Sequence, residues 1–142
     1  MTLPRTPSQT VGPYYEIGLC RRSENELVPP GEPSAVRLTG QLLDGDEVPV
    51  SDGVIEVWDA ENRRWGRCGT DADGRFSFLV GGVQHLEVYV FARGLLRHQL
   101  TRIYFPGAAS EAPAALVAEQ EDGGLRFDIR LQGERQTVFF AV

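Results

Sequence analysis

Lysine is absent from this sequence of 142 residues, and histidine and cysteine occur only twice each. All fourteen basic residues are therefore arginines, and twenty acidic residues bring the formal net charge to −6. A nucleic-acid-binding protein needs clustered positive charge, so this balance argues against such a partner. No apolar run approaches the roughly 18 residues of a membrane-spanning helix, so we expect no membrane segment. The two cysteines, Cys20 and Cys68, are too few for a disulfide scaffold and too far apart for a CxxC motif.

What the sequence does contain is typical of an ordinary globular protein. A chain of this length can form one hydrophobic core and buries roughly 70% of the surface of its unfolded state. Its hydrophobic content of 42% and charged content of 24% are usual for such proteins. The stretch from Met1 to Arg5 lacks the apolar core of a signal peptide, and both cysteines are expected to be reduced thiols. These features predict a cytoplasmic protein.

The distribution of proline divides the sequence into two parts. Six of the nine prolines lie within residues 1–34. Because proline fixes φ and cannot donate a backbone hydrogen bond, this segment is predicted to be an extended N-terminal arm. The arm also carries Val11, Tyr14, Tyr15 and Ile17, which is more apolar surface than a disordered tail usually holds. We therefore expect the arm to be ordered by packing on the chain's own core or on a partner chain.

Residues 35–142 are predicted to form a single β-sandwich domain. Apolar residues within 36–42 alternate with polar ones, as they do in a half-buried strand. Gly81-Gly82 and Gly123-Gly124 are typical of hairpin turns, and one short helix is expected from Ala112 to Glu119. Seven short strands separated by turn residues favour an antiparallel sandwich. Besides 36–42, the expected strands are 54–58, 75–79, 85–92, 100–105, 125–131 and 137–142.

Few residues are candidates for chemistry. The sequence has no glycine-rich phosphate loop, no GxSxG elbow and no reactive-cysteine signature. His85 and Glu87 are expected on one face of a strand, because alternate residues share a side. If the strands on either side of His98 form a hairpin, His98 lies near its turn, on the order of 23 Å from His85 at about 3.3 Å per residue. The two imidazoles therefore cannot share an ion, and His85 is expected to have a structural, hydrogen-bonded role.

Two segments carry side chains suited to contacts with another molecule. Tyr14 and Tyr15 lie in the proline-rich arm, where they could anchor an interface, whereas the aromatic residues of the strands are expected to be mostly core. The loop from Ala92 to His98 places Arg93 beside leucines at the end of a strand. Such an arginine could pair with a carboxylate of a partner chain or of an aromatic acid, or it could be solvated.

Three stretches of the sequence resemble one known family. Residues 6–15, TPSQTVGPYY, are similar to the opening of the intradiol ring-cleavage dioxygenases, especially the alpha chains of protocatechuate 3,4-dioxygenase. Residues 90–96 with 100–105, and residues 124–134 with 137–140, resemble the same alpha chains. The similarity runs in order along nearly the whole chain. It implies a mostly-β fold, an antiparallel β-sandwich of the intradiol dioxygenase type, with a proline-rich arm and at most one short helix.

The resemblance also implies where the metal of this family would be held. In the family, the catalytic beta chain holds Fe(III) with two tyrosines and two histidines. Its His-x-His pair matches His85-Leu86-Glu87 here, so one imidazole remains and His85 and Glu87 mark a vestigial metal position. The tyrosine ligands would fall between Trp58 and Cys68 and before His85, in short loops without tyrosine. The resemblance therefore implies no metal and no catalytic residue in this chain, with Fe(III) in a partner beta chain.

A substrate-binding wall shared with that partner is implied by five further residues. Thr10, Gly12 and Pro13 match arm residues that reach the neighbouring site in the family, and Tyr14 follows them. Glycine permits close backbone approach there, and proline stiffens the arm. Arg93 matches an arginine near the shared cavity.

The implied function is that of a non-iron-binding alpha subunit. On a catalytic beta chain in a hetero-oligomer, it would support O2-dependent cleavage of protocatechuate to 3-carboxy-cis,cis-muconate, in the β-ketoadipate pathway of aromatic catabolism. The isolated chain is expected to be inactive. Two alternatives stay open: a stand-alone, non-enzymatic β-sandwich binding or assembly protein, which the shortened loops would suit, and a lone metalloenzyme with the burgundy colour of Fe(III)–tyrosinate.

Overall fold

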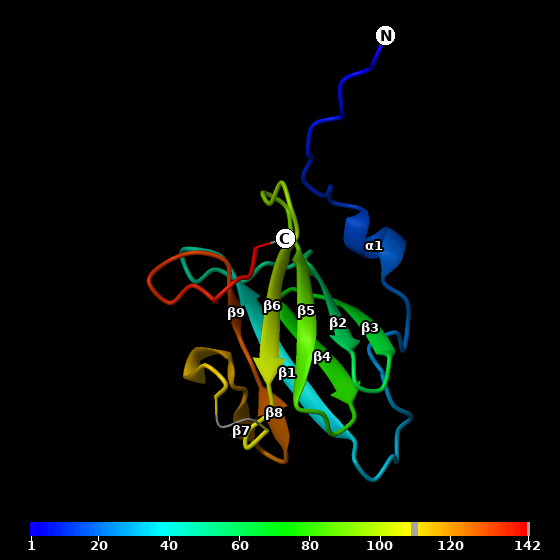
Figure 1. Ribbon diagram of the computed structural model, residues 1–142, viewed down its shortest axis with the longest axis vertical. Helices are drawn as coiled ribbons and strands as arrows, with labels where there is room; N and C mark the ends of the chain where they lie inside the picture. The colour runs from blue at the N-terminus through cyan, green and yellow to red at the C-terminus, as the bar shows by residue number, and fades with distance from the viewer. Residues whose placement is uncertain (109–110, 142) are drawn as a thin grey trace.

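Two packed β-sheets and an N-terminal arm make up the computed structural model, which describes residues 1–108 and 111–141 (Figure 1). The strands of the first sheet are β1 (Val36–Leu43), β4 (Arg75–Val80), β7 (Glu119–Glu121), β8 (Gly124–Arg126) and β9 (Ile129–Arg130). Those of the second sheet are β2 (Val54–Asp59), β3 (Arg64–Gly69), β5 (His85–Phe91) and β6 (Gln99–Tyr104). No helix in the described part of the chain is long and apolar enough to cross a membrane.

The pairing of the strands is antiparallel with two exceptions. The second sheet has the order β3-β2-β5-β6 and every pair in it is antiparallel. In the first sheet, of order β4-β1-β8-β7, β1 is antiparallel to β4 but parallel to both β8 and β9. The predicted mostly-β sandwich is therefore confirmed, with a mixed first sheet.

Period-two alternation places the core between the sheets. In β5, Leu86, Val88 and Val90 are fully buried, whereas His85 and Glu87 are half-buried on the outer face. Burial of such aliphatic side chains contributes roughly 1.5–3 kcal/mol each. The largest fully buried side chains come from both sheets and the segments beside them: Phe78, Leu38, Leu42, Ile55, Leu86, Ile103, Leu116 and Ile129.

Residues 24–28 close one side of the sandwich. The backbone of this segment makes two hydrogen bonds with Leu79 of β4, at 2.8 and 2.9 Å. The N–H of Arg67 in β3 donates to the carbonyl of Glu24 at 2.9 Å. The segment thus satisfies backbone groups on the edges of both sheets, which would otherwise be open to pairing with another chain.

Several local predictions were wrong. The helix expected from Ala112 to Glu119 is only a 3₁₀ turn, η1 (Ala114–Leu116). The strand expected at 137–142 forms a single bridge, between Leu100 and Phe140, within its described residues, and residue 142 lies outside them. Gly81-Gly82 is no hairpin turn, because it joins β4 of the first sheet to β5 of the second.

Other local features were confirmed or were not anticipated. Gly123, with φ of 80°, does turn the β7–β8 hairpin. The strand expected at 125–131 is divided into β8 and β9, both paired with β1. Strand β3 and a one-turn helix in the arm, α1 (Tyr15–Leu19), were not predicted.

Candidate functional site

The arm and the loop between β5 and β6 meet at one end of the sandwich (Figure 1). The hydroxyl of Thr10 donates to the carbonyl of Ala92 at 3.4 Å and accepts from the N–H of Gly94 at 2.8 Å. These two hydrogen bonds flank Arg93. The structure therefore brings together Thr10 and Arg93, two of the predicted wall residues, in what we call the arm–loop junction: Thr10 with Ala92, Arg93 and Gly94.

A carboxylate that the sequence did not single out orients Arg93. The Nε of Arg93 forms an ion pair with Oδ2 of Asp52, while 57% of the Arg93 side chain stays exposed. Asp52 precedes β2 in a turn held by Thr70, whose hydroxyl donates to Val50 O at 2.6 Å and accepts from Gly53 N–H at 2.9 Å. The guanidinium is thus held at its Nε edge but accessible to a ligand. The one sequence feature that marks Asp52 is its place in Ser51-Asp52-Gly53, a stretch typical of a turn.

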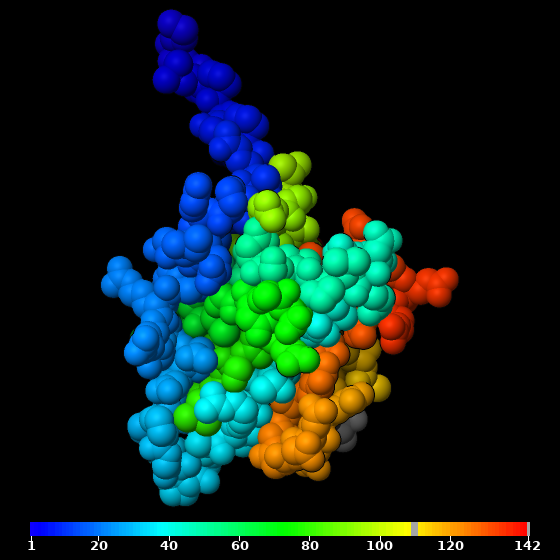
Figure 2. Space-filling view, turned by 180° about the vertical axis from the view of Figure 1, so that it is seen from behind, coloured from blue at the N-terminus to red at the C-terminus, as the bar shows by residue number. Residues whose placement is uncertain are grey.

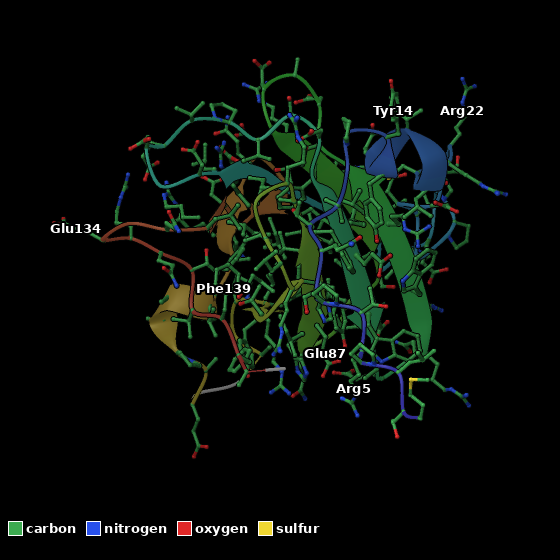
Figure 3. All side chains as sticks on the ribbon, turned by 90° about the horizontal axis from the view of Figure 1, so that it is seen from above. Arg5, Tyr14, Arg22, Glu87, Glu134 and Phe139 are labelled. Atoms are coloured by element: carbon green, nitrogen blue, oxygen red, sulfur yellow. The ribbon has the colours of Figure 1, made fainter. Side chains whose placement is uncertain are left out.

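The remaining predicted wall residues point away from this chain. Tyr14 is 77% exposed, and Figure 3 shows its side chain directed outward from the arm. Pro13 is exposed, and a Cβ placed on Gly12 would meet no heavy atom within 4 Å. The structure therefore does not join Gly12, Pro13 and Tyr14 to Arg93 in one pocket. Their predicted role at a partner's site stays a prediction.

The arm is attached to the second sheet just after these residues. The ring of Tyr15 packs on Phe91 with centroids 5.7 Å apart, and burial raises the pKa of the Tyr15 phenol. Arg67 of β3 donates to the carbonyl of Leu19 at 3.3 Å while pairing with Glu56 at 2.8 Å. By contrast, the first residues of the arm extend beyond the body of the sandwich (Figure 2).

The residues at the vestigial metal position do not fit a ferric centre. The ring of His85 packs on Tyr104 with centroids 5.3 Å apart, and Glu87 lies 3.6 Å from Arg102. His98 lies at the other end of β5, where its ring is 5.4 Å from that of Phe91. Among residues 1–108 and 111–141, no three His, Cys, Asp or Glu side chains are grouped closely enough to hold an ion. Although the Tyr104 phenol lies beside it, His85 is a single imidazole, whereas the centre that the resemblance implies has two histidines together with two tyrosines.

The two cysteines are poorly suited to nucleophilic chemistry. Burial, with Glu16 and Cys68 nearby, raises the pKa of the Cys20 thiol to about 11. Burial also raises the pKa of Cys68. Because the thiolate is the reactive form, both groups are mostly unreactive thiols at neutral pH.

The outer face of the second sheet carries exposed aromatic rings. Trp65 of β3 is 43% exposed and stacks under the Arg67 guanidinium, 4.7 Å from its ring centroid. At the opposite edge, Arg102 lies 5.5 Å from the ring centroid of Phe140, which is also partly exposed. Aromatic and arginine side chains of this kind are common at protein interfaces. This face therefore carries the types of side chain that protein interfaces use.

Comparisons with known sequences identify close relatives over the full length, although no family model matches the chain. It is 31% identical to the protocatechuate 3,4-dioxygenase alpha chain of Burkholderia cepacia, covering 99% of each chain. It is 32% identical to the corresponding alpha chain of Pseudomonas putida, covering 97% of this chain and 96% of that one. The first alignment spans 195 positions, whereas this chain has 142 residues, so the relative contains segments that are missing here.

Solved structures share the fold. The dioxygenase domain of a carbohydrate-binding fusion protein from Streptomyces sp. SirexAA-E superposes with a TM-score of 0.62 at 22% identity, covering 92% of this chain and 99% of that one. Catechol 1,2-dioxygenase from Pseudomonas arvilla C-1 gives 0.56 at 20% identity, covering 76% of this chain and 55% of that one. By its full-length relatives and its fold, this chain belongs to the protocatechuate 3,4-dioxygenase alpha-chain family of the intradiol dioxygenases.

Proposed function

We propose that this chain is the iron-free alpha subunit of a protocatechuate 3,4-dioxygenase-like complex. Its partner, a catalytic beta chain, would hold Fe(III) and cleave protocatechuate with O2 to 3-carboxy-cis,cis-muconate. The observation that carries this proposal is the relationship to two protocatechuate 3,4-dioxygenase alpha chains over nearly their full length. The position of His85 and Glu87 supports the assignment of the iron to the partner, because it offers one imidazole instead of two and its carboxylate is paired with Arg102.

The role of this chain would be to complete the wall of the partner's substrate site. Arg93, oriented by Asp52 and still exposed, suits a carboxylate such as that of an aromatic acid. The hydrogen bonds of Thr10 hold the arm against the loop of Arg93, so that Gly12 and Pro13 follow an anchored residue. The free space around Gly12 would admit the backbone of another chain.

The outer face of the second sheet and the exposed side of the arm are the surfaces that we assign to the partner. Both expose large apolar side chains, among them Trp65 on the sheet and Ile17 on the arm. Such residues are enriched where protein interfaces are buried. A partner that covered both surfaces would also reach the junction, since α1 packs on the same sheet through Tyr15 and Phe91.

Co-expression with the beta chain of an intradiol dioxygenase tests this function. O2 consumption and formation of the carboxymuconate would be measured for the complex, for each chain alone, and together with iron content. We expect ring cleavage by the complex, and a colourless, iron-free and inactive alpha chain. Metal bound by the side chains of this chain alone, or ring opening by it alone, would overturn the proposal. A stable homo-oligomer that ignores the beta chain would favour the stand-alone β-sandwich protein instead.

A further inference from the structure

The arm forms one wall of an open pocket that none of the five predicted wall residues lines. The pocket has a volume of about 400 Å³ and lies between the arm and the loop that follows β5. This size falls within the range of roughly 300–1,000 Å³ that is common for small-molecule sites. We call it the arm pocket and define it by six of its lining residues: Val11, Tyr15, Phe91, Leu95, Arg97 and His98.

The two sides of the arm are used differently. Gln9, Val11 and Tyr15 line the arm pocket, whereas Gly12 and Tyr14 are exposed and do not line it. Alternate residues of an extended chain share a side, which explains why Gln9 and Val11 both line the pocket, whereas Tyr14 and Tyr15 lie in the turn that leads into α1. Phe91 lies on the outer face of β5, so the pocket includes part of the sheet face that is proposed to meet the partner.

Aromatic rings form part of the pocket wall. The ring of Phe91 lies between those of Tyr15 and His98, with centroid distances of 5.7 and 5.4 Å. The two neighbouring rings are tilted to it by 37° and 34°. With Val11 and Leu95 beside them, these side chains offer an apolar surface to a flat ring, and tilted or offset aromatic contacts of this kind are favourable.

The charge of the pocket is opposite to that of the whole chain. The chain has a net charge of −6, yet none of the described acidic residues lines the pocket, whereas the exposed side chain of Arg97 does. Within the described ranges, Arg97 forms no ion pair, unlike Arg93, which pairs with Asp52. Glu56 is near Tyr15, but it is paired with an arginine of β3 at 2.8 Å. An unpaired guanidinium beside an apolar wall suits a carboxylate attached to a ring.

We infer that the arm pocket of this chain binds a small monocyclic aromatic carboxylate by itself. The ring packs on Phe91 and Tyr15, and the carboxylate is held by Arg97. This goes beyond the proposed function, because the site is formed by one chain and requires neither the partner nor its iron.

Isothermal titration of the purified full-length chain with 4-hydroxybenzoate tests this inference. Phenol, which lacks the carboxylate, and cyclohexanecarboxylate, which lacks the aromatic ring, serve as probes of the two contacts. We expect saturable binding of one 4-hydroxybenzoate per chain, and at least tenfold weaker binding of both other compounds. Arg97→Gln should weaken 4-hydroxybenzoate binding at least tenfold, and Phe91→Leu, which keeps an apolar side chain, should weaken it several-fold.

Arg37→Gln is the matched control, because Arg37 lies on β1 of the other sheet and contacts Ser77. It should change the affinity less than twofold, and thermal denaturation would verify that each variant is folded. Absence of saturable binding, equal binding of phenol, or equal effects of the two arginine variants would overturn the inference. A chain that folds only together with its partner would also overturn the inference, because the site would then not belong to one chain. None of these results bears on ring cleavage by the co-expressed complex, so the two proposals can fail separately.

Discussion

The sandwich and the arm differ in how closely the chain packs around their glycines, as Gly40 and Gly12 show. A Cβ on Gly40 of β1 would clash with the backbone oxygen of Phe127 and with the ring of Phe76. A Cβ on Gly12 of the arm would touch nothing within 4 Å, and the φ of Gly12 is not in the left-handed region. The packing of this chain therefore explains the glycine in the sandwich but not the glycine in the arm.

Large apolar side chains show the same contrast. In the sandwich, Phe78 and Leu38 are completely buried. In the arm, Tyr14 and Ile17 keep more than two thirds of their surface exposed, which loses the free energy of burial. The difference indicates that the core of the sandwich is complete within one chain, whereas the exposed side of the arm fits a surface that another chain would supply.

The largest effect is expected from adding a methyl group in the sandwich. Gly40→Ala should lower the free energy of unfolding by about 3 kcal/mol, because the clash involves backbone that cannot move aside. Urea denaturation would measure it. Gly12→Ala is the matched control and should change stability by less than about 0.5 kcal/mol. Equal losses in the two variants would contradict the contrast between the regions.

A bulky residue in the arm should impair ring cleavage by the assembled complex without changing the stability of the chain alone. Pro13→Phe in the assembled complex is expected to raise the KM for protocatechuate or lower turnover about tenfold, equivalent to about 1.4 kcal/mol. The melting temperature of the chain alone should not change, because Pro13 is exposed. Steady-state kinetics at varied protocatechuate concentration would measure the effect. Unchanged kinetics would exclude the arm from the site.

Loss of the junction should loosen the arm without unfolding the sandwich. Thr10→Val removes both hydrogen bonds to the loop, worth about 1 kcal/mol in local stability. Hydrogen exchange at the Gly94 amide, which donates to Thr10, should accelerate about fivefold. Thr6→Val is the control, because within the described structure the Thr6 side chain makes no hydrogen bond. Unchanged exchange in the Thr10 variant would show that the arm is held elsewhere.

The smallest effect concerns Cys20, where the arm reaches the second sheet. Its pKa is raised from 9.0 to about 11 in the folded chain, so the folded state keeps a proton that the unfolded state loses. Stability should therefore fall as the pH rises from about 9 to about 11, and it should not depend on this group below that window. The difference in unfolding free energy between the unmodified chain and Cys20→Ala would isolate the effect. If the unmodified chain instead became more stable relative to Cys20→Ala as the pH rises, the prediction would be wrong.

Much of the sandwich was predictable from period-two alternation. Strands such as β5 show it clearly, because every second residue from Leu86 to Val90 is buried. Strand β3 was missed because RWGRCG has no such alternation, and its pairing with β2 defines it instead. The helix α1 was missed because its single turn has no side-chain cap and includes Gly18, so packing of Tyr15 on Phe91 stabilises it.

By itself, the sequence determined the alternation that separates core from surface, the proline-rich arm, and the presence of one histidine in His85-Leu86-Glu87. These properties are local, because they depend on residue type and spacing along the chain. Only the tertiary structure decided that Thr10 meets the loop of Arg93, that Asp52 holds the guanidinium, and that the arm and the β5–β6 loop together line a pocket. Contacts between such distant residues depend on how the two sheets pack and on where the arm lies against the loop after β5. No short-range sequence pattern encodes that geometry.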